Sequence, residues 1–262
     1  MSKLETLEVV ESEGVVSIGL NRPDVHNAFN DILIREMVEL FDGFEGREDL
    51  RAIVLRGDGK NFCAGADLNW MAGMVDYDRN ENIRDSAELA KMFATINESP
   101  VPVIGRIQGA AIGGGVGLVA VCDIVIAETA SKFGLSEVKL GILPAVISPY
   151  VIRKIGETHA RALFLTGERF GVERARAIGL VHHVADGLEE LDRAVERVVG
   201  DLKTSGPQAV RECKRLIEHV AHSELADAIP YTIEAIAERR ISSEGQAGMK
   251  AFLDREKPPW AG

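Results

Sequence analysis

The spacing of apolar residues predicts alternating strands and helices in the first half of the chain. Two short apolar runs, residues 4–10 and 15–20, are joined through Gly14 and are typical of a β-hairpin. Residues 30–44 have helical spacing, with most apolar side chains on one side and Asn30 as a potential N-cap. This start already favours an α/β protein.

The same pattern continues with further strands predicted at residues 51–57, 101–109 and 122–127. An amphipathic helix is predicted over residues 78–99, where Pro100 ends it. We therefore expect strands with interleaved helices in one α/β core.

After about residue 149 the strand pattern largely disappears. Residues 206–220 and 223–241 have helical periods, and we expect Pro230 to bend or interrupt the second of these helices. The chain should therefore end in a helical region that follows the α/β core.

Composition and charge restrict the possible partners. The chain has 262 residues, of which 46% are hydrophobic, and its net charge is −11. Nucleic-acid surfaces depend on basic residues, so this balance counts against RNA or DNA as a partner. No apolar run approaches the ~20 residues that a membrane-spanning helix needs.

The cysteines and the first residues indicate a reducing compartment. Cys63, Cys122 and Cys213 are too few and too scattered for a disulfide framework, and no spacing suggests a metal site. The start MSKLETLEVVESEG has neither an apolar signal core nor the look of a transit peptide. We expect a cytoplasmic protein that needs no metal.

The most unusual stretch is residues 112–120, IGGGVGLVA, which from Gly115 fits the dinucleotide-binding pattern G-x-G-x-x-A. That fold needs a full helix and then a strand that ends in an acid. Here the next strand begins near Cys122, and its terminal acid Glu128 comes only 13 residues after Gly115. The spacing therefore argues against a dinucleotide site.

Glycines at a helix start can instead direct backbone N–H groups at a developing oxyanion, or they can serve close packing. A second stretch, NFCAGADLNWM (residues 61–71), has a similar turn through Ala64, Gly65 and Ala66 before a helix that starts near Asp67. Two such loops could hold one carbonyl oxygen from two sides. Because neither stretch contains a histidine, we interpret Cys63 as a buried structural thiol.

With these motifs the chain resembles the enoyl-CoA hydratase/isomerase (crotonase) superfamily over its full length. The matching segments are LNRPDVHNAF, FCAGADL, GAAIGGGVGLVAVCDIVIA, FGLSEVKLGILP and SSEGQAGMKAFLDREKPPW. The resemblance implies a crotonase-type α/β spiral of β-β-α turns over residues 1–195 and a helical region over 196–262 for assembly and site cover. It further implies acyl-CoA thioester substrates, no separate cofactor, and homotrimers or dimers of trimers.

The resemblance also assigns site residues. Ala64 and Gly114 would donate the oxyanion N–H groups, and Glu137 would be the acid/base. The backbone of Ala64, Gly65, Ala66, Asp67 and Leu68 would line the CoA arm. Arg22, Lys60 and Lys257 stand at positions for CoA phosphates, although each could equally be a solvated charge; Asp24 replaces a lysine that is frequent in the family.

The main departure from the family is Gly117, which stands where the best-known hydratases have a second glutamate. A lone carboxylate suits double-bond isomerisation, and it can also support hydration if Glu137 both activates the water and returns a proton. Hydration is favoured because the segments around Glu137 and the C-terminus resemble a methylglutaconyl-CoA hydratase-like subgroup. A non-catalytic CoA-binding protein and an RNA-binding one remain the alternatives.

The resemblance leaves the acyl chain open. Ser148 and Tyr150 in the segment ISPY could orient water or a substrate carboxylate, although Ser148 could simply cap a helix. A glutaconyl-type substrate would need a cation, for which Arg84 and Lys91 are the candidates. Both could equally lie on a solvated helix face.

Overall fold

The larger sheet has six strands in the order β1-β2-β3-β4-β6-β9 and is parallel except for the β1–β2 hairpin. The computed structural model describes residues 4–261. The strands of this sheet are β1 (Leu7–Ser12), β2 (Val15–Leu20), β3 (Ala52–Gly57), β4 (Val103–Ile107), β6 (Ile124–Glu128) and β9 (His183–Ala185). A second sheet, in the order β5-β7-β8, contains β5 (Ala110–Ile112), β7 (Lys132–Gly134) and β8 (Arg169–Gly171).

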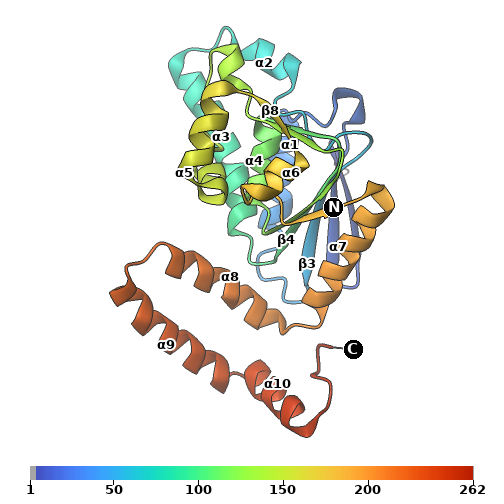
Figure 1. Cartoon of the computed structure of the whole chain (residues 1–262), viewed down its shortest axis with the longest axis vertical. Coiled ribbons are helices and arrows are strands. Elements are labelled where there is room, and N and C mark those ends of the chain that lie inside the picture. The colour runs from blue at the N-terminus through green and yellow to red at the C-terminus, as the bar shows by residue number, and fades with distance from the viewer. Residues whose placement is uncertain (1–3, 262) are drawn as a thin grey trace.

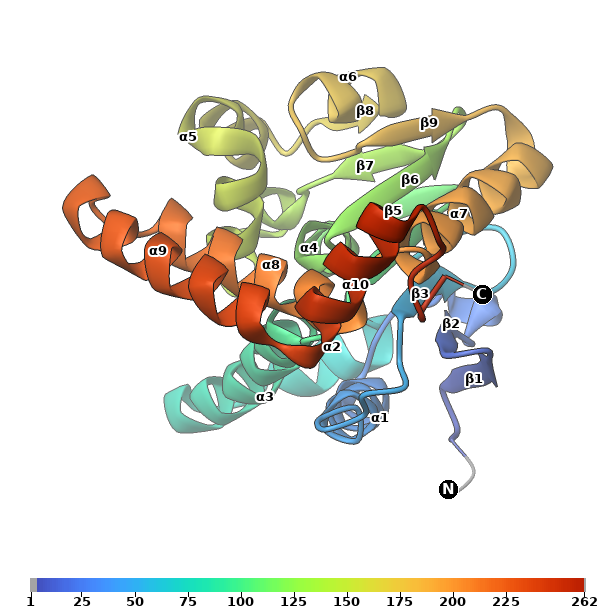
Figure 2. The ribbon, with the colours of Figure 1, turned by 90° about the horizontal axis from the view of Figure 1, so that it is seen from below.

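The structure has ten α-helices and two short 3-10 helices within residues 4–261, and all but the last three helices lie around the sheets (Figures 1 and 2). They are η1 (Pro23–Val25), α1 (Asp31–Asp42), α2 (Leu68–Met74), α3 (Arg79–Glu98), α4 (Gly114–Val121), η2 (Glu137–Leu140), α5 (Ser148–Thr166), α6 (Val172–Ala177), α7 (Gly187–Lys203), α8 (Pro207–Ala221), α9 (Leu225–Ile241) and α10 (Ser243–Asp254). Asn30 caps α1, as predicted, by accepting a hydrogen bond from the Leu33 N–H.

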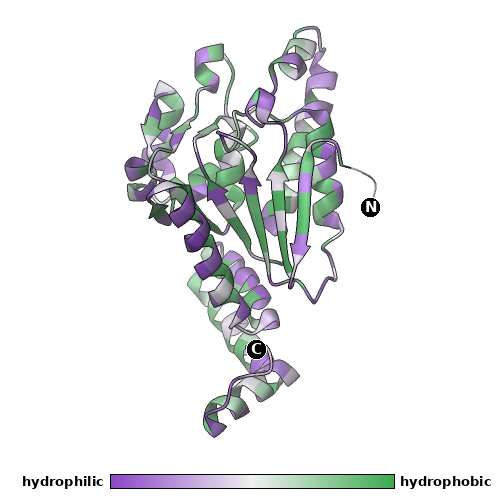
Figure 3. Cartoon of the chain, turned by 90° about the vertical axis from the view of Figure 1, so that its right-hand side faces the viewer, coloured by the Kyte–Doolittle hydropathy of each residue, from purple (hydrophilic) through white to green (hydrophobic). Residues whose placement is uncertain are grey.

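Both faces of the larger sheet are covered, which explains the continuous apolar runs of its central strands (Figure 3). Along β3, Ile53 and Leu55 point into the main core, while Ala52 and Val54 point to the opposite face. The main core includes side chains from α1, α3, α4 and α5, and α7 covers the other face.

The predicted α/β class and its β-β-α organisation are confirmed, whereas the division into two regions at residue 195 stays a prediction. That position lies inside α7, whose Leu191, Ala194 and Val195 pack on the sheet. The helices that leave the core begin after Lys203 (Figure 1).

The last three helices form a separate group that extends from the core along the long axis of the molecule (Figure 1). The helices α9 and α10 pack mainly on α8 and on each other. Pro230 lies within α9 but does not interrupt it, contrary to one of the two outcomes that we expected. Pro230 lacks the N–H that would bond to the Ala226 carbonyl oxygen, and α9 continues on both sides of it.

Candidate functional site

Three chain segments end together at one edge of the smaller sheet. β5 pairs with β7 in parallel, with Ile112 opposite Gly134, and Cys63 forms a parallel bridge with Ala111 on the other side of β5. Since parallel segments end at the same edge, the residues that follow them are brought together. These are the turn around Gly65, the first turn of α4, and Glu137.

Each glycine in the first turn of α4 is approached by a different part of the chain. A Cβ atom at Gly113 would lie 3.1 Å from Glu137 Oε1, and one at Gly114 would lie 2.2 Å from the ring of Phe29. At Gly115 it would lie 2.3 Å from the carbonyl oxygen of Cys63. A Cβ atom at Gly114 or Gly115 would overlap its neighbour, and Gly113 has a φ of +54° that side chains rarely adopt, so the glycines make the close approach possible.

Gly117, one turn further, lies against apolar side chains. A Cβ atom there would lie 2.2 Å from Ile147 Cγ2 and 2.9 Å from Phe93 Cε1. Phe93 also packs edge-on against Phe29 and lies next to Tyr150, with ring centroids 6.5 and 6.2 Å apart. The place where a second carboxylate was missing from the sequence is therefore filled with hydrocarbon.

Glu137 is the first residue of η2 and is partly buried. Its Oε2 atom is fully shielded from solvent and has no hydrogen-bond partner among residues 4–261, and no other side-chain oxygen or nitrogen in that range shares this condition. Burial raises the pKa of Glu137, and a hydrogen bond from its own backbone only partly opposes the shift. A carboxylate kept without partners is suited to take up a proton.

Two backbone N–H groups beside this carboxylate have no acceptor within the described chain. Gly114 is the first residue of α4, where the N–H groups have no partner inside the helix. The Ala66 N–H also lacks an acceptor, and the preceding residue, Gly65, has a φ of +91°. A Cβ atom added to Gly65 would lie 3.6 Å from the Gly114 nitrogen. The two N–H groups therefore belong to adjoining parts of the backbone.

The predicted donor Ala64 does not fit this structure, because its N–H donates to the carbonyl oxygen of His26 at 3.0 Å. An N–H that is already paired is not available for an oxyanion. The prediction missed Ala66, two residues later. The glycine between them was the available signal, since its positive φ breaks the regular direction of the strand.

The predicted CoA-contacting residues have different environments. Arg22 forms an ion pair with Asp67 at 2.9 Å and also donates to the Ala28 carbonyl oxygen, so it is held within the fold. Asp67 in turn caps α2, accepting from the Asn69 and Trp70 N–H groups. Leu68 is 81% exposed at the start of α2.

Of the other two predicted cations, Lys60 is exposed and forms no ion pair within residues 4–261. It precedes the 61–67 loop and therefore stays near the predicted CoA arm. Lys257 lies in the segment after α10, at the opposite end of the molecule from α2 (Figure 1). The contact of Lys257 with the CoA phosphates therefore stays a prediction, and within one copy the segment that carries Lys257 lies away from α2 (Figure 1).

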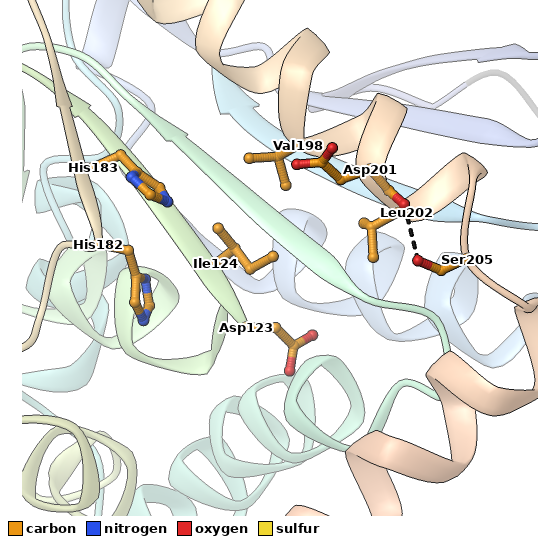
Figure 4. Close-up of a pocket in the computed structure, with 8 residues that line it drawn as sticks. All are labelled: Asp123, Ile124, His182, His183, Val198, Asp201, Leu202 and Ser205. Atoms are coloured by element: carbon orange, nitrogen blue, oxygen red, sulfur yellow. Dashed lines mark hydrogen bonds between the residues drawn. The ribbon is translucent and has the colours of Figure 1, made fainter.

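Cys63 is fully buried, and burial raises the pKa of its thiol to about 12. The structure agrees with our interpretation of this cysteine as structural. A pocket between β6, β9 and α7 is lined by His182, His183 and Asp123 among others, but by none of the predicted site residues (Figure 4). The His182 Nδ1 atom there accepts from the Val125 N–H, which gives this histidine a structural role.

Residues 4–261 were also compared with the requirements of a metal site and of a membrane-spanning helix. No group of three or more histidine, cysteine, aspartate or glutamate side chains in residues 4–261 is arranged to hold a metal ion. No helix in that range has the length and apolar character needed to cross a bilayer.

The fold and the site define an α/β protein in which two adjoining N–H donors lie near the partly buried carboxylate of Glu137. A model of the family described as enoyl-CoA hydratase/isomerase matches residues 10–262. The chain therefore belongs to the enoyl-CoA hydratase/isomerase family, within the crotonase superfamily of enzymes, as the sequence motifs predicted.

Individual relatives agree over nearly the whole chain. A crystal structure of an enoyl-CoA hydratase from Shewanella pealeana is 38% identical, covers 98% of this chain and 97% of its own, and has a TM-score of 0.94. AtuE from Pseudomonas aeruginosa is 34% identical over 98% of this chain and 100% of its own, with a TM-score of 0.96. Enoyl-CoA hydratase AKT6-1 from Alternaria alternata is 35% identical over 94% of this chain and 80% of its own.

Proposed function

We propose that this enzyme adds water across the 2,3 double bond of an enoyl-CoA thioester. The observation that carries the proposal is the unpartnered Oε2 atom of Glu137 beside the first turn of α4. The N–H groups of Ala66 and Gly114 would hold the thioester oxygen. Losing one such donor typically costs about 3–4 kcal/mol of transition-state stabilisation.

In this mechanism the Glu137 carboxylate takes a proton from water as the water oxygen bonds to C3. The π electrons move toward C1, and the thioester becomes an enolate whose oxygen is held by the two N–H groups. The enolate then takes a proton at C2 from the Glu137 carboxyl group, which regenerates the carboxylate. One carboxylate thus performs both proton transfers, and the enzyme neither loses nor gains a proton over the cycle.

Isomerisation is the second candidate, and the apolar surroundings of Gly117 favour it. With Ile147 and Phe93 packed against Gly117, position 117 supplies no carboxylate to hold the water from the other side. Glu137 alone could move a proton between C2 and C4 of a 3-enoyl thioester. The two reactions differ in whether water is added.

The experiment is a panel of crotonyl-CoA, 3-methylcrotonyl-CoA and 3-hexenoyl-CoA, followed by enoyl absorbance and product mass. Hydration of the 2-enoyl esters should remove the conjugated absorbance and add the mass of one water. Isomerisation of the 3-enoyl ester should create absorbance without a change in mass. Turnover of the 3-enoyl ester only, with no product containing added water, would overturn the hydratase assignment.

We further propose that the active form is a homotrimer or a dimer of trimers that binds acyl-CoA. Large apolar side chains are exposed on α9 and α10, where Leu225, Ile233 and Phe252 are 74%, 61% and 83% exposed. Large apolar side chains exposed on projecting helices are typical of surfaces that associate. A second copy could bring Lys257 to the CoA phosphates, and light scattering after gel filtration tests the assembly.

A further inference from the structure

Phe29 contacts both backbone segments that carry the proposed oxyanion donors. Its backbone forms a parallel bridge with Ala66, and its ring occupies the space that a Cβ atom of Gly114 would need. Phe29 is only 2% exposed, so its ring is enclosed on all sides. A single buried residue therefore connects the two donor segments.

The bridge to Phe29 determines the direction of the Ala66 N–H. The Phe29 N–H donates to the Gly65 carbonyl oxygen at 2.8 Å, and the Asp67 N–H donates to the Phe29 carbonyl oxygen at 3.0 Å. In a parallel bridge these two bonds flank the opposite residue, whose own N–H is directed to the other side. The Ala66 N–H is therefore turned away from Phe29, and it has no acceptor within residues 4–261.

The ring of Phe29 supports the other donor segment. Its Cζ atom lies nearest to the position of a Cβ atom on Gly114. Trp70 and Phe93 pack edge-on against this ring, with centroids 6.0 and 6.5 Å away. Because protein interiors are close-packed, the ring cannot leave Gly114 without displacing another ring. The first turn of α4 therefore rests on a ring that is itself held in place.

The backbone on each side of Phe29 is also held in place. The Arg22 guanidinium pairs with Asp67 at 2.9 Å and donates to the Ala28 carbonyl oxygen, so it joins the residue before Phe29 to the turn opposite. On the other side, Asn30 caps α1. Phe29 therefore has a fixed backbone position from which its ring reaches α4.

We propose that Phe29 is a positioning residue that sets the separation between the Ala66 and Gly114 N–H groups. Two donors stabilise an enolate oxygen together only when each lies about 2.7–3.1 Å from it. A misplacement of about 1 Å in such a site can cost about 100-fold in rate. The inference rests on the proposed function, since it takes these two N–H groups as the donors for the thioester oxygen.

Two substitutions change the contact with α4 in opposite directions. Phe29→Leu shortens the side chain and keeps the backbone bonds, whereas Phe29→Tyr adds an oxygen at Cζ, the atom nearest to Gly114. We expect kcat for the 2-enoyl ester that the wild type hydrates fastest to fall about 10–100-fold in both variants. The value of KM should change less than about threefold, because the donors act mainly on the transition state.

Phe41→Leu is the matched control. Phe41 is 4% exposed and packs against Phe44 near the C-terminal end of α1, about 15 Å along the helix axis from its start. The same change should lower Tm by a similar amount at both positions, but at Phe41 it should leave kcat unchanged. Circular dichroism checks folding, and Phe29→Met, which fills much of the space without a rigid ring, takes the place of Phe29→Leu if that variant does not fold.

A spectroscopic measurement separates positioning from a general loss of packing. The absorbance of a conjugated thioester such as cinnamoyl-CoA moves to longer wavelength when hydrogen bonds polarise its carbonyl group. The measurement uses saturating cinnamoyl-CoA in the Glu137→Gln background, in which turnover is slowed. Adding Phe29→Leu or Phe29→Tyr to this background should reduce the shift, and adding Phe41→Leu should leave it unchanged.

The outcomes distinguish this inference from the proposed function. A loss of kcat in Phe29→Leu no larger than that in Phe41→Leu overturns the inference, as does an absorbance shift that is the same with and without Phe29. If the shift depends on Phe29 but no 2-enoyl ester gains water, the hydratase assignment alone fails. The absence of any shift while Phe29 is intact contradicts both.

Discussion

The first turn of α4 has two unlike sides. At Gly113 the neighbouring group is the carboxylate of Glu137, whereas one turn along, at Gly117, the neighbours are Ile147 and Phe93. Both sides use glycine to bring another element close, but one approach leaves a polar atom without a partner and the other excludes polar atoms altogether. Glycine in the sequence therefore indicates close approach and does not identify the approaching group.

This contrast explains how one carboxylate can be sufficient. The apolar side removes water and lowers the local dielectric, which strengthens the interactions of the charges that remain. The pKa of Glu137 is raised by the burial of its own carboxyl group. Both proton transfers therefore depend on Glu137 alone.

The largest effect is expected from Glu137→Gln, which keeps the size of the side chain but cannot carry the proton. The rate kcat on whichever enoyl-CoA is turned over should fall by about 10²–10⁴, the usual contribution of a positioned acid/base. Steady-state kinetics provide the measurement. A variant that retains full activity on every substrate would disprove the assignment of Glu137.

The stability of the same variant is the control. Because the pKa of Glu137 is raised in the folded state, the ionised carboxylate opposes folding at neutral pH, and its removal should not lower Tm. A small rise, below about 1 kcal/mol or ~2–4 °C, is expected. A large fall in Tm would mean that the activity loss reflects misfolding.

The next largest effect is a loss of stability, expected for a substitution at Gly117 on the apolar side of α4. Gly117→Glu would place a Cβ atom 2.2 Å from Ile147 Cγ2 and a carboxylate among hydrocarbon, so we expect a loss of about 3 kcal/mol or more and no gain in activity. Urea unfolding measures the loss. The double variant Gly117→Glu/Ile147→Gly makes room and should recover part of it; no recovery would show that Ile147 is not the obstacle.

The sequence predicted the fold class and the hairpin, because local apolar spacing specifies them. The residues at 15–20 form β2 as expected, and Asn30 caps α1. The edge where the site forms depends on pairing between β5, β7 and Cys63, segments that are distant along the chain. No local sequence pattern predicts that pairing. The position of the site could therefore be predicted only from the family resemblance of the motifs.

The choice between Ala64 and Ala66 shows the limit most clearly. In a regular strand the N–H groups of residues i and i+2 point the same way, so the letters alone do not separate the two alanines. The φ of +91° at Gly65 and the carbonyl group of His26 decide the matter in the structure. Lys257 is a similar case, since its position depends on how α8 to α10 leave the core.

A moderate effect is expected on the acid side of the pH profile. Hydration needs ionised Glu137, and burial holds its pKa above the ordinary value of 4.5. The value of kcat/KM should therefore fall as the pH falls through that raised pKa, and the midpoint should lie above 4.5. A midpoint at or below 4.5 in a pH-rate profile would contradict the burial of this carboxylate.

The smallest effect is expected for Cys63, which lies on the polar side of the turn but takes no part in the chemistry. Its thiol is fully buried, and its raised pKa keeps it protonated at neutral pH. Cys63→Ala should change kcat less than about threefold and cost ~1–2 kcal/mol of stability through the small cavity. The exposed Cys213 provides the control, because in the native protein it should react with a thiol reagent far faster than Cys63. Loss of activity on modification that persists in Cys213→Ser would make Cys63 a participant.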